Sequence, residues 1–229
     1  MKILAIIPAR GGSKGIPKKN SLLFDGKTLV EYSIKSATQS KLVDKIIISS
    51  DDDDILKVAS SYSNVHIHKR KKNLSGDKSP VIDTVLEILK HEIDFEVVVL
   101  LQPTSPLRTG IDIDNALKML IDNSEINSII SVVETNDVHP ARMYWHEKNR
   151  LKPILSEFEN SRRQDIPIAL YRNGAIYITR VSSLKKTREL MAKPSAGYIM
   201  DSKFLLNIDD QRDLVISEAM IKYWKKSNE

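Results

Sequence analysis

Short apolar runs alternate with helical patterns along most of the chain. The runs expected to form β-strands are rich in Ile, Val and Leu, and they cover residues 2–7, 45–49, 65–68, 96–101, 128–133 and 175–179. Between several of these runs, apolar residues recur every three or four positions, as on one face of a helix. Strands that alternate with helices in this way are typical of an α/β fold with a mixed, mostly parallel sheet.

Capping residues mark three of the expected helix starts. Thr28 is followed three residues later by Glu31, which is the spacing of a capping box. Ser79 before Pro80 predicts an N-cap and a first helical position, because proline is favoured at the first turn. Asp210 precedes an apolar stripe over 214–224 and is expected to cap a C-terminal helix.

The alternation weakens over residues 134–165, where polar residues, prolines and scattered aromatics replace a clean pattern. We interpret this segment as an arm inserted into a single domain that spans residues 1–229, since a chain of this length supports one large core. The arm could form a dimer contact, close over a site as a lid, or be a plain surface excursion.

Composition narrows the class of protein. Hydrophobic residues make up 41% of the chain, and no run approaches the length of apolar sequence that a membrane span needs, so we expect no membrane segment. The first apolar run is too short for a signal peptide. The sequence has no cysteine, which excludes disulfides and thiolate metal sites and fits a cytoplasmic location.

The formal charge of +5 favours an anionic partner. Basic residues cluster at 10–19, 69–72, 162–163 and 222–226, whereas aromatic residues amount to 6% and do not interleave with these clusters. Stacking on bases therefore has little support, and we expect no nucleic-acid binding. A small anionic substrate remains the favoured partner.

The loop after the first predicted strand has the composition of a phosphate-binding loop. It contains Arg10, Gly11, Gly12, Ser13, Lys14, Gly15, Lys18, Lys19 and Asn20. Glycines let backbone N–H groups approach an anion, and the cations supply charge. Ligands of open α/β sheets also sit at the carboxyl ends of strands. The spacings of the Walker A motif and of the dinucleotide fingerprint are missing, and a flexible basic connection is the alternative.

Four segments together resemble one family. They are IIPARGGSKGIPKKN at 6–20, LLQPTSPLR at 100–108, RRQD at 162–165 and RNGAIYI at 172–178. In this order they resemble the acylneuraminate cytidylyltransferases, also called CMP-sialic acid synthetases, including those that act on legionaminic and pseudaminic acid. The resemblance spans nearly the whole chain. It implies a three-layer, Rossmann-like fold of the nucleotide-diphospho-sugar transferase type, a homodimer built partly from the arm, and a reaction that depends on Mg²⁺ or Mn²⁺.

The resemblance also implies roles for particular residues. The nucleotide CTP would be held by Arg10, Gly11, Ser13, Lys14, Lys19, Asn20 and Arg70. The acidic sugar would be contacted by Gln102, Arg142, Arg163, Gln164, Asn173 and Tyr177. Arg10 and Lys19 are expected to be catalytic, because they would neutralise charge that shifts onto the leaving pyrophosphate. The neighbouring Lys18 is expected to face solvent.

Some positions depart from the family or have a structural alternative. The arginine that relatives carry two residues before the asparagine would stand at Tyr171, whereas here it is Arg172. Arg108 is expected to have a structural role, paired with an acid. Arg142 lies in the arm, from which it could reach the active site of a partner subunit.

The expected metal site also departs from the family. Relatives carry an Asp-Ile-Asp segment near the C-terminus, whereas this chain has Asn207, Ile208 and Asp209. Extended residues two apart point the same way, so Asn207 and Asp209 could converge on one ion. An amide oxygen can bind a hard cation but brings no charge. The acidic run at 51–54 is interpreted as a helix start that the helix dipole favours.

The expected reaction joins CTP and an N-acylneuraminate, or a related nine-carbon acid, to give a CMP-sugar and pyrophosphate. The anomeric hydroxyl of the sugar would attack the α-phosphorus, with Arg10, Lys19 and Asp209 as the catalytic residues; no general base is assigned. The alternatives are the same chemistry on legionaminic, pseudaminic or the eight-carbon Kdo acid, and a nucleotide-binding homologue without catalysis, which Asn207 keeps open.

Overall fold

The structure of the protein, a computed structural model, describes residues 1–13, 15–135 and 138–228. A seven-stranded sheet runs through the body in the order β11-β7-β10-β6-β1-β4-β5. Its strands are β1 Ile3–Pro8, β4 Lys45–Ser50, β5 Val65–Lys69, β6 Val97–Leu100, β7 Ser128–Thr135, β10 Ala169–Arg180 and β11 Ser195–Met200. Strand β10 is antiparallel to both of its neighbours, while the other pairs in this sheet are parallel. The predicted mixed, mostly parallel sheet is confirmed.

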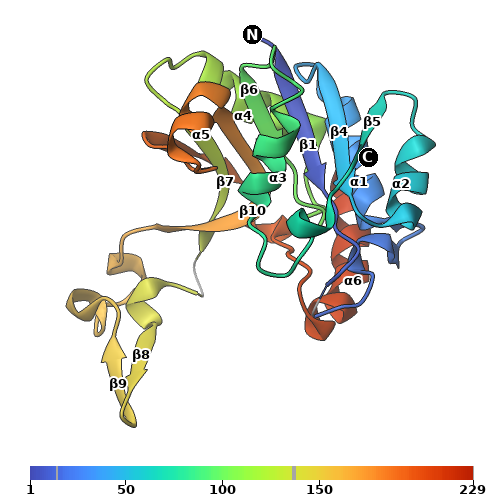
Figure 1. Ribbon diagram of the computed structural model, residues 1–229. Helices are drawn as coiled ribbons and strands as arrows, with labels where there is room; N and C mark the ends of the chain where they lie inside the picture. The colour runs from blue at the N-terminus through green and yellow to red at the C-terminus, as the bar shows by residue number, and fades with distance from the viewer. Residues whose placement is uncertain (14, 136–137, 229) are drawn as a thin grey trace.

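Helices cover both faces of the sheet (Figure 1). They are α1 Leu29–Gln39, α2 Asp53–Ser60, α3 Val81–Ile88, α4 Gly110–Ile121, α5 Val181–Thr187 and α6 Gln211–Asn228. Apolar residues of α1, α2 and α4 pack with Ile3, Ala5 and Ile7 of β1. Those of α3 and α5 pack with Leu4 and Ile6, which point to the opposite face of the same strand. The result is the expected three-layer arrangement.

Helix α6 packs away from both faces, at the carboxyl-end side of the sheet. Its residues Ile221 and Trp224 lie in one apolar cluster with Ile16 of the first loop and Leu29 of α1. A small hairpin of β2 Leu23–Phe24 and β3 Lys27–Thr28 adds to this cluster through Phe24. The packing ties the segment that precedes α6 to the first loop.

The predicted helix caps have mixed outcomes. The capping box of Thr28 and Glu31 is present, and Asp210 accepts a hydrogen bond from the amide of Asp213 at 3.0 Å. The acidic run begins α2, with Asp52 as its N-cap. The N-cap predicted at Ser79 is wrong, because Pro80 occupies that position and the Ser79 hydroxyl donates to the Asn73 carbonyl at 3.0 Å.

The segment between β7 and β10 projects from the body as an arm (Figure 1). Thr135 pairs with Ala169 at its base, so the described arm comprises residues 138–168, close to the predicted range of 134–165. It carries the hairpin of β8 Tyr144–Glu147 and β9 Arg150–Pro153. Within the described residues, no helix is both long and apolar enough to cross a lipid bilayer.

Candidate active site

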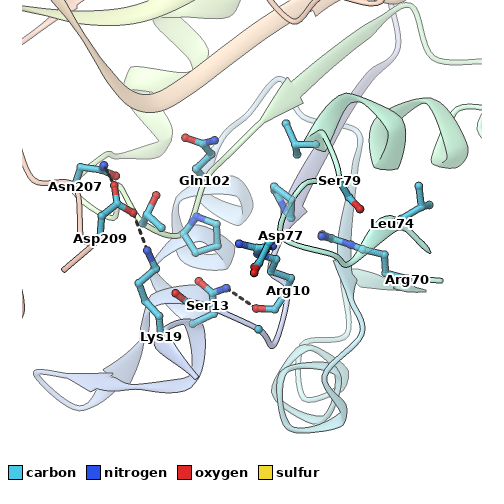
Figure 2. Close-up of a pocket in the computed structure, with 16 residues that line it drawn as sticks. Arg10, Ser13, Lys19, Arg70, Leu74, Asp77, Ser79, Gln102, Asn207 and Asp209 are labelled. Atoms are coloured by element: carbon cyan, nitrogen blue, oxygen red, sulfur yellow. Dashed lines mark hydrogen bonds and ion pairs between the residues drawn. The ribbon is translucent and has the colours of Figure 1, made fainter. Parts of the chain in front are cut away.

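A cavity of about 360 Å³ lies where several loops meet beyond the carboxyl ends of β1 and β6. Its lining comes from the first loop, the loop after β5, the loop after β6 and the segment before α6 (Figure 2). The predicted residues that line it are Arg10, Ser13, Lys19, Asn20, Arg70, Gln102, Asn207 and Asp209. The structure thus gathers most of the expected nucleotide and metal residues around one space.

Lys19 stands at one side of this cavity and Lys18 points elsewhere. The Lys19 side chain is largely buried, and its Nζ donates to the Ile208 carbonyl at 2.6 Å and to Asp209 Oδ1 at 2.8 Å. Lys18 is exposed and its Nζ lies 3.1 Å from Asp54 Oδ2. The prediction that Lys18 faces solvent is confirmed.

Arg10 joins the first loop to the loop after β5. Its Nη1 donates to the Gly76 carbonyl at 3.0 Å and lies 3.1 Å from Asp77 Oδ1. Asn20 holds the first loop closed, since its Nδ2 donates to the Arg10 carbonyl at 2.9 Å (Figure 2). Both Arg10 and Lys19 are therefore paired with carboxylates at the rim of the cavity.

Gly11 differs from the expected phosphate cradle. The Gly11 amide donates to Asp51 Oδ1 at 3.0 Å, and a Cβ on Gly11 would lie 2.7 Å from Asp52 Oδ2. Glycine is needed there because the acidic start of α2 approaches closely, and its N–H is already taken by a carboxylate. Lys14, also predicted to bind the nucleotide, lies outside the described residues.

Arg70 enters the cavity from the end of β5, opposite Lys19 (Figure 2). It is buried, and its Nε and Nη2 donate to the hydroxyl and the carbonyl of Ser49 at 3.0 and 2.7 Å. The pKa of Arg70 is lowered to about 10, mainly by burial and to a smaller extent by the charge of Arg10, while Asp51 acts in the opposite direction. Sequence analysis missed Ser49, because only the pairing of β4 with β5 brings it beside Arg70.

The pair expected to hold a metal ion lies on the Lys19 side of the cavity. Ile208 is fully buried, and the flanking Asn207 and Asp209 both line the cavity. Asn207 accepts a hydrogen bond from the Ser105 hydroxyl at 3.2 Å and donates to Asp209 Oδ2. Among the described residues, no group of three His, Cys, Asp or Glu side chains could hold a metal.

The oxygen donors of Asn207 and Asp209 are of the kind that Mg²⁺ prefers. Mg²⁺ commonly keeps several waters and binds one or two carboxylates together with substrate phosphates. The Asp209 side chain is 60% exposed and faces the cavity, with the Asn207 amide beside it. The two residues therefore fit an ion that enters with a polyphosphate, and they offer too few ligands to hold one alone.

A second cavity, of about 640 Å³, continues from the first, because Gln102 and Val81 line both. Its cations are Arg172, Arg188 and Lys193, and its apolar wall includes Ile82, Ile130, Leu190 and Met191. Tyr177, a predicted sugar residue, also lines it, and burial raises the pKa of its hydroxyl. Sequence analysis missed Arg188, which belongs to none of the four family segments.

Asn173 lies close to this cavity but turns its side chain inward. Its Oδ1 accepts hydrogen bonds from the Ser131 hydroxyl at 2.6 Å and from the Ala175 amide at 3.2 Å. The register of β10 against β7 shifts between Arg172 and Tyr177, and Gly174 has a φ of +77° in that bulge. Asn173 therefore holds the bulge, and it lines neither of the two connected cavities.

The other predicted sugar residues lie in the arm. Arg142, Arg163 and Gln164 line a third cavity, of about 390 Å³, together with His139 and Ile168. Arg142 also donates to the Ser161 carbonyl at 2.9 Å. The arm extends away from the body (Figure 1), so these three residues stand apart from Gln102 and Tyr177.

Arg108 has the expected structural role with different partners. It is fully buried, and it donates to the carbonyls of Gln102 and Ser105 at 3.1 and 2.5 Å and to the Ser33 hydroxyl at 2.6 Å. The pairing with an acid is replaced by these neutral acceptors. Arg108 thereby fixes the loop that presents Gln102 to both cavities.

Comparison with known proteins identifies relatives over almost the full chain. A protein of Escherichia coli named N-acylneuraminate cytidylyltransferase is 32% identical over 227 residues, which are 99% of this chain and 53% of that protein. Pseudaminic acid cytidylyltransferase of Campylobacter jejuni is 31% identical, and CMP-N,N'-diacetyllegionaminic acid synthase of Legionella pneumophila is 32% identical. Each of these alignments covers 97% of both chains, whereas the chain spans only about half of the Escherichia coli relative.

Solved structures share the fold at lower identity. CMP:2-keto-3-deoxy-manno-octonic acid synthetase complexed with CTP superposes with a TM-score of 0.72 at 16% identity, covering 97% of this chain and 99% of that one. A 4-diphosphocytidyl-2C-methyl-D-erythritol synthase gives 0.67 at 13% identity, with 96% and 99% coverage. The expected nucleotide-diphospho-sugar transferase type of fold is confirmed. The family model described as Cytidylyltransferase matches residues 4–196, and the chain belongs to this family.

Proposed function

We propose that this protein transfers CMP from CTP to the anomeric hydroxyl of a nine-carbon acidic sugar, an N-acylneuraminate or a related nonulosonic acid, and releases pyrophosphate. The observation that carries the proposal is the cavity in which Arg10, Lys19 and Arg70 meet the Asn207 and Asp209 pair. Three cations around one space suit a triphosphate. The names of the relatives supply the class of nucleotide and sugar.

Arg10 and Lys19 would bind the phosphates and stabilise the leaving pyrophosphate. Phosphoryl transfer depends mainly on positioning and on electrostatic stabilisation. A cation in a buried site stabilises the charge of the transition state more than a cation in water does. In the free protein each cation is held by a carboxylate, Asp77 or Asp209. These ion pairs keep the two side chains at the cavity, where phosphate oxygens can replace the carboxylates as partners.

Asp209 and Asn207 would hold a Mg²⁺ or Mn²⁺ ion together with the phosphates of CTP. The ion would supply positive charge against the phosphate oxygens when bound. Asn207 brings no charge, so the affinity for the ion should depend strongly on the nucleotide. Lys19 already lies 2.8 Å from Asp209, and phosphate that draws Lys19 away would leave this carboxylate to the ion.

The sugar would lie in the second cavity, with Gln102 between it and the nucleotide. The arginines and lysine of that cavity suit a carboxylate, and its apolar wall suits acyl substituents. Legionaminic and pseudaminic acid have as much support as N-acylneuraminate. The relatives named for pseudaminic and legionaminic acid are 31% and 32% identical, and the relative named for N-acylneuraminate is 32% identical.

We also propose a homodimer in which the arm completes the sugar site of the partner subunit. Arg163 and Gln164 belong to a segment that faces the sugar in the family, and Arg142 is expected to reach the site of a partner, yet all three line a cavity of the arm. The hairpin carries exposed apolar residues, among them Trp145 at 60% and Leu151 at 68%. Exposed apolar residues on a projecting hairpin support a contact with a second chain. We also propose a cytoplasmic location, which the lack of cysteine and the use of CTP support.

The test is an assay of pyrophosphate release with CTP, Mg²⁺ and a panel of nonulosonic acids that includes Kdo. We expect release with at least one nine-carbon acid and loss of release when the divalent ion is chelated. Measurable CTP binding without release for any sugar would contradict the proposal and indicate a nucleotide-binding homologue without catalysis. Relative kcat/KM values across the panel identify the sugar.

A further inference from the structure

A chain of hydrogen bonds joins His68, Ser49 and Arg70 beside the nucleotide cavity. His68 of β5 is the register partner of Ser49 of β4. The Ser49 hydroxyl lies 2.9 Å from His68 Nδ1 and accepts from Arg70 Nε at 3.0 Å. Ser49 is fully buried and Arg70 is 7% exposed, so water does not compete freely for these bonds. Neither Ser49 nor His68 belongs to any of the four segments that resemble the family.

The direction of each bond follows from the donors available. A guanidinium nitrogen can only donate, so the Ser49 oxygen must accept from Arg70. A hydroxyl carries one proton, and its other near partner is His68 Nδ1. The Ser49 proton has an acceptor when Nδ1 is the unprotonated nitrogen of a neutral imidazole, and the lowered pKa of His68 favours that neutral form. Burial lowers the pKa of His68, as do Arg70, Lys71 and His91, while Glu87 raises it.

These contacts leave the Nη1 nitrogen of Arg70 available to a ligand. Nε and Nη2 are both bound to Ser49, and Nη1 has no hydrogen-bond partner in the part of the chain that the structure describes. The guanidinium points into the cavity, toward Asp77 and Arg10 (Figure 2). Arginine has many rotamers, so a contact that selects one of them before binding lowers the entropic cost of binding.

We propose that His68 and Ser49 are positioning residues for the nucleotide: the imidazole orients the Ser49 hydroxyl, and the hydroxyl fixes the Arg70 guanidinium so that Nη1 faces CTP. This inference rests on the proposed function, because it takes the cavity to be the CTP site. It predicts that His68 influences CTP binding without touching CTP. The effect should appear in KM for CTP and not in kcat.

The test compares three variants of β5. His68→Leu removes the acceptor at similar volume, His68→Asn keeps an acceptor near the position of Nδ1, and His66→Leu is the matched control. His66 is exposed and points the same way as His68, because the two are two positions apart on one strand. We expect His68→Leu to raise KM for CTP about threefold to tenfold, with kcat at saturating CTP within about twofold of wild type. His68→Asn and His66→Leu should stay near wild type.

A second comparison shows whether His68 acts through the hydroxyl. Ser49→Ala should raise KM for CTP at least as much as His68→Leu, and the double variant should be no worse than Ser49→Ala alone. Additive effects would overturn the inference. So would a wild-type KM in His68→Leu, or an equal rise in His66→Leu. If His68→Leu does not fold, KM for CTP is compared between Ser49→Ala and His68→Asn. Thermal unfolding midpoints show whether each variant is folded.

Calorimetric titration of CTP without sugar separates this inference from the proposed function. If wild type binds CTP but releases no pyrophosphate with any sugar, the proposed function fails, and the Kd for CTP of the His68 variants still tests the positioning role. If wild type releases pyrophosphate and His68→Leu has a wild-type Kd, the positioning role alone fails. No CTP binding by wild type would overturn both.

Discussion

At the scale of single residues, two adjacent lysines of the first loop provide a controlled test of the phosphate site. Lys19 is buried against Asp209, whereas Lys18 is exposed and paired with Asp54. We expect Lys19→Ala to lower kcat about a hundredfold or more, because it removes a preorganised cation. Lys18→Ala should keep wild-type turnover, since its charge is screened by solvent. Pyrophosphate release measures both, and equal losses would contradict the assignment.

His68 should also make stability depend on pH. The pKa of His68 in the folded protein lies below its ordinary value of 6.5, first because of burial and then because of Arg70. The unfolded chain therefore binds more protons between the two pKa values, and stability rises with pH across that window. The contribution of neutral His68 to the free energy of unfolding should be fully present above pH 6.5 and lost as the pH falls through the pKa of the folded state.

Urea unfolding between about pH 5 and pH 7 measures this dependence. Wild type should lose more free energy of unfolding on acidification than His68→Asn, in which residue 68 no longer titrates while the other four histidines are unchanged. Parallel pH curves for the two proteins would show that folding does not lower the pKa of His68.

Arg108 should contribute to stability and, through it, to the placement of Gln102. Arg108→Met leaves the buried carbonyl of Ser105 without its donor and the part-buried carbonyl of Gln102 with the Ser105 amide alone, which should cost about 1–3 kcal/mol of unfolding free energy. Arg180 is the comparison, because it too donates to main-chain carbonyls but is partly exposed. Arg180→Met should cost less, since water can replace it. Denaturant unfolding of both variants gives the two values.

At the scale of elements, the first loop and the segment before α6 meet at Gly15. A Cβ on Gly15 would collide with the main-chain oxygen of Asp209, which cannot move without shifting the start of α6. Gly15→Ala should therefore lower the unfolding midpoint by several degrees and displace Asp209. Gly12 is the control, since a Cβ there meets nothing within 4 Å. Thermal unfolding of both variants tests this contact, and equal midpoints would refute it.

The elements that sequence analysis predicted are those with local signals. The capping box at Thr28 and the strand before the first loop need only neighbours in sequence, and both were predicted. Strand β11 and helix α5 were missed. Strand β11 lies at the sheet edge with alternating, partly exposed residues, and α5 is a short helix whose basic last turn gives little periodicity. In segments with such weak sequence patterns, tertiary packing determines whether a strand or a helix forms.

The same distinction explains the predictions of site residues. Arg10, Lys19 and Asn20 lie in one loop, so a motif suffices to place them together. Asn173 lies in a recognisable segment, yet its side chain turns inward because of a bulge that no local pattern encodes. The partner of Gly11 proved to be Asp51, forty residues away. Contacts of this kind depend on strand order, which the motif does not contain.

At the scale of the whole molecule, the body and the arm divide the expected site. The body gathers Lys19, Arg10 and Gln102 around two connected cavities. The arm carries Arg142 and Arg163 in a separate cavity and projects outward (Figure 1). If both sets act on one sugar, two chains must exchange arms. Symmetric homodimers are the commonest oligomers, and a two-fold axis would give each body the arm of its partner.

Mixing two inactive variants tests this exchange directly. Lys19→Ala damages the body site, and Arg163→Ala damages the arm. In a mixed dimer, the body with intact Lys19 receives the intact arm of the other chain, so one of its two sites is complete. Random pairing makes half of the dimers mixed, and the mixture should therefore recover about a quarter of wild-type turnover.

Recovery needs subunit exchange, so the chains are mixed unfolded and refolded together, with each variant refolded alone as the control. Turnover no greater than the mean of the two variants, from a mixture shown by light scattering to be dimeric, would mean that the arm serves its own chain.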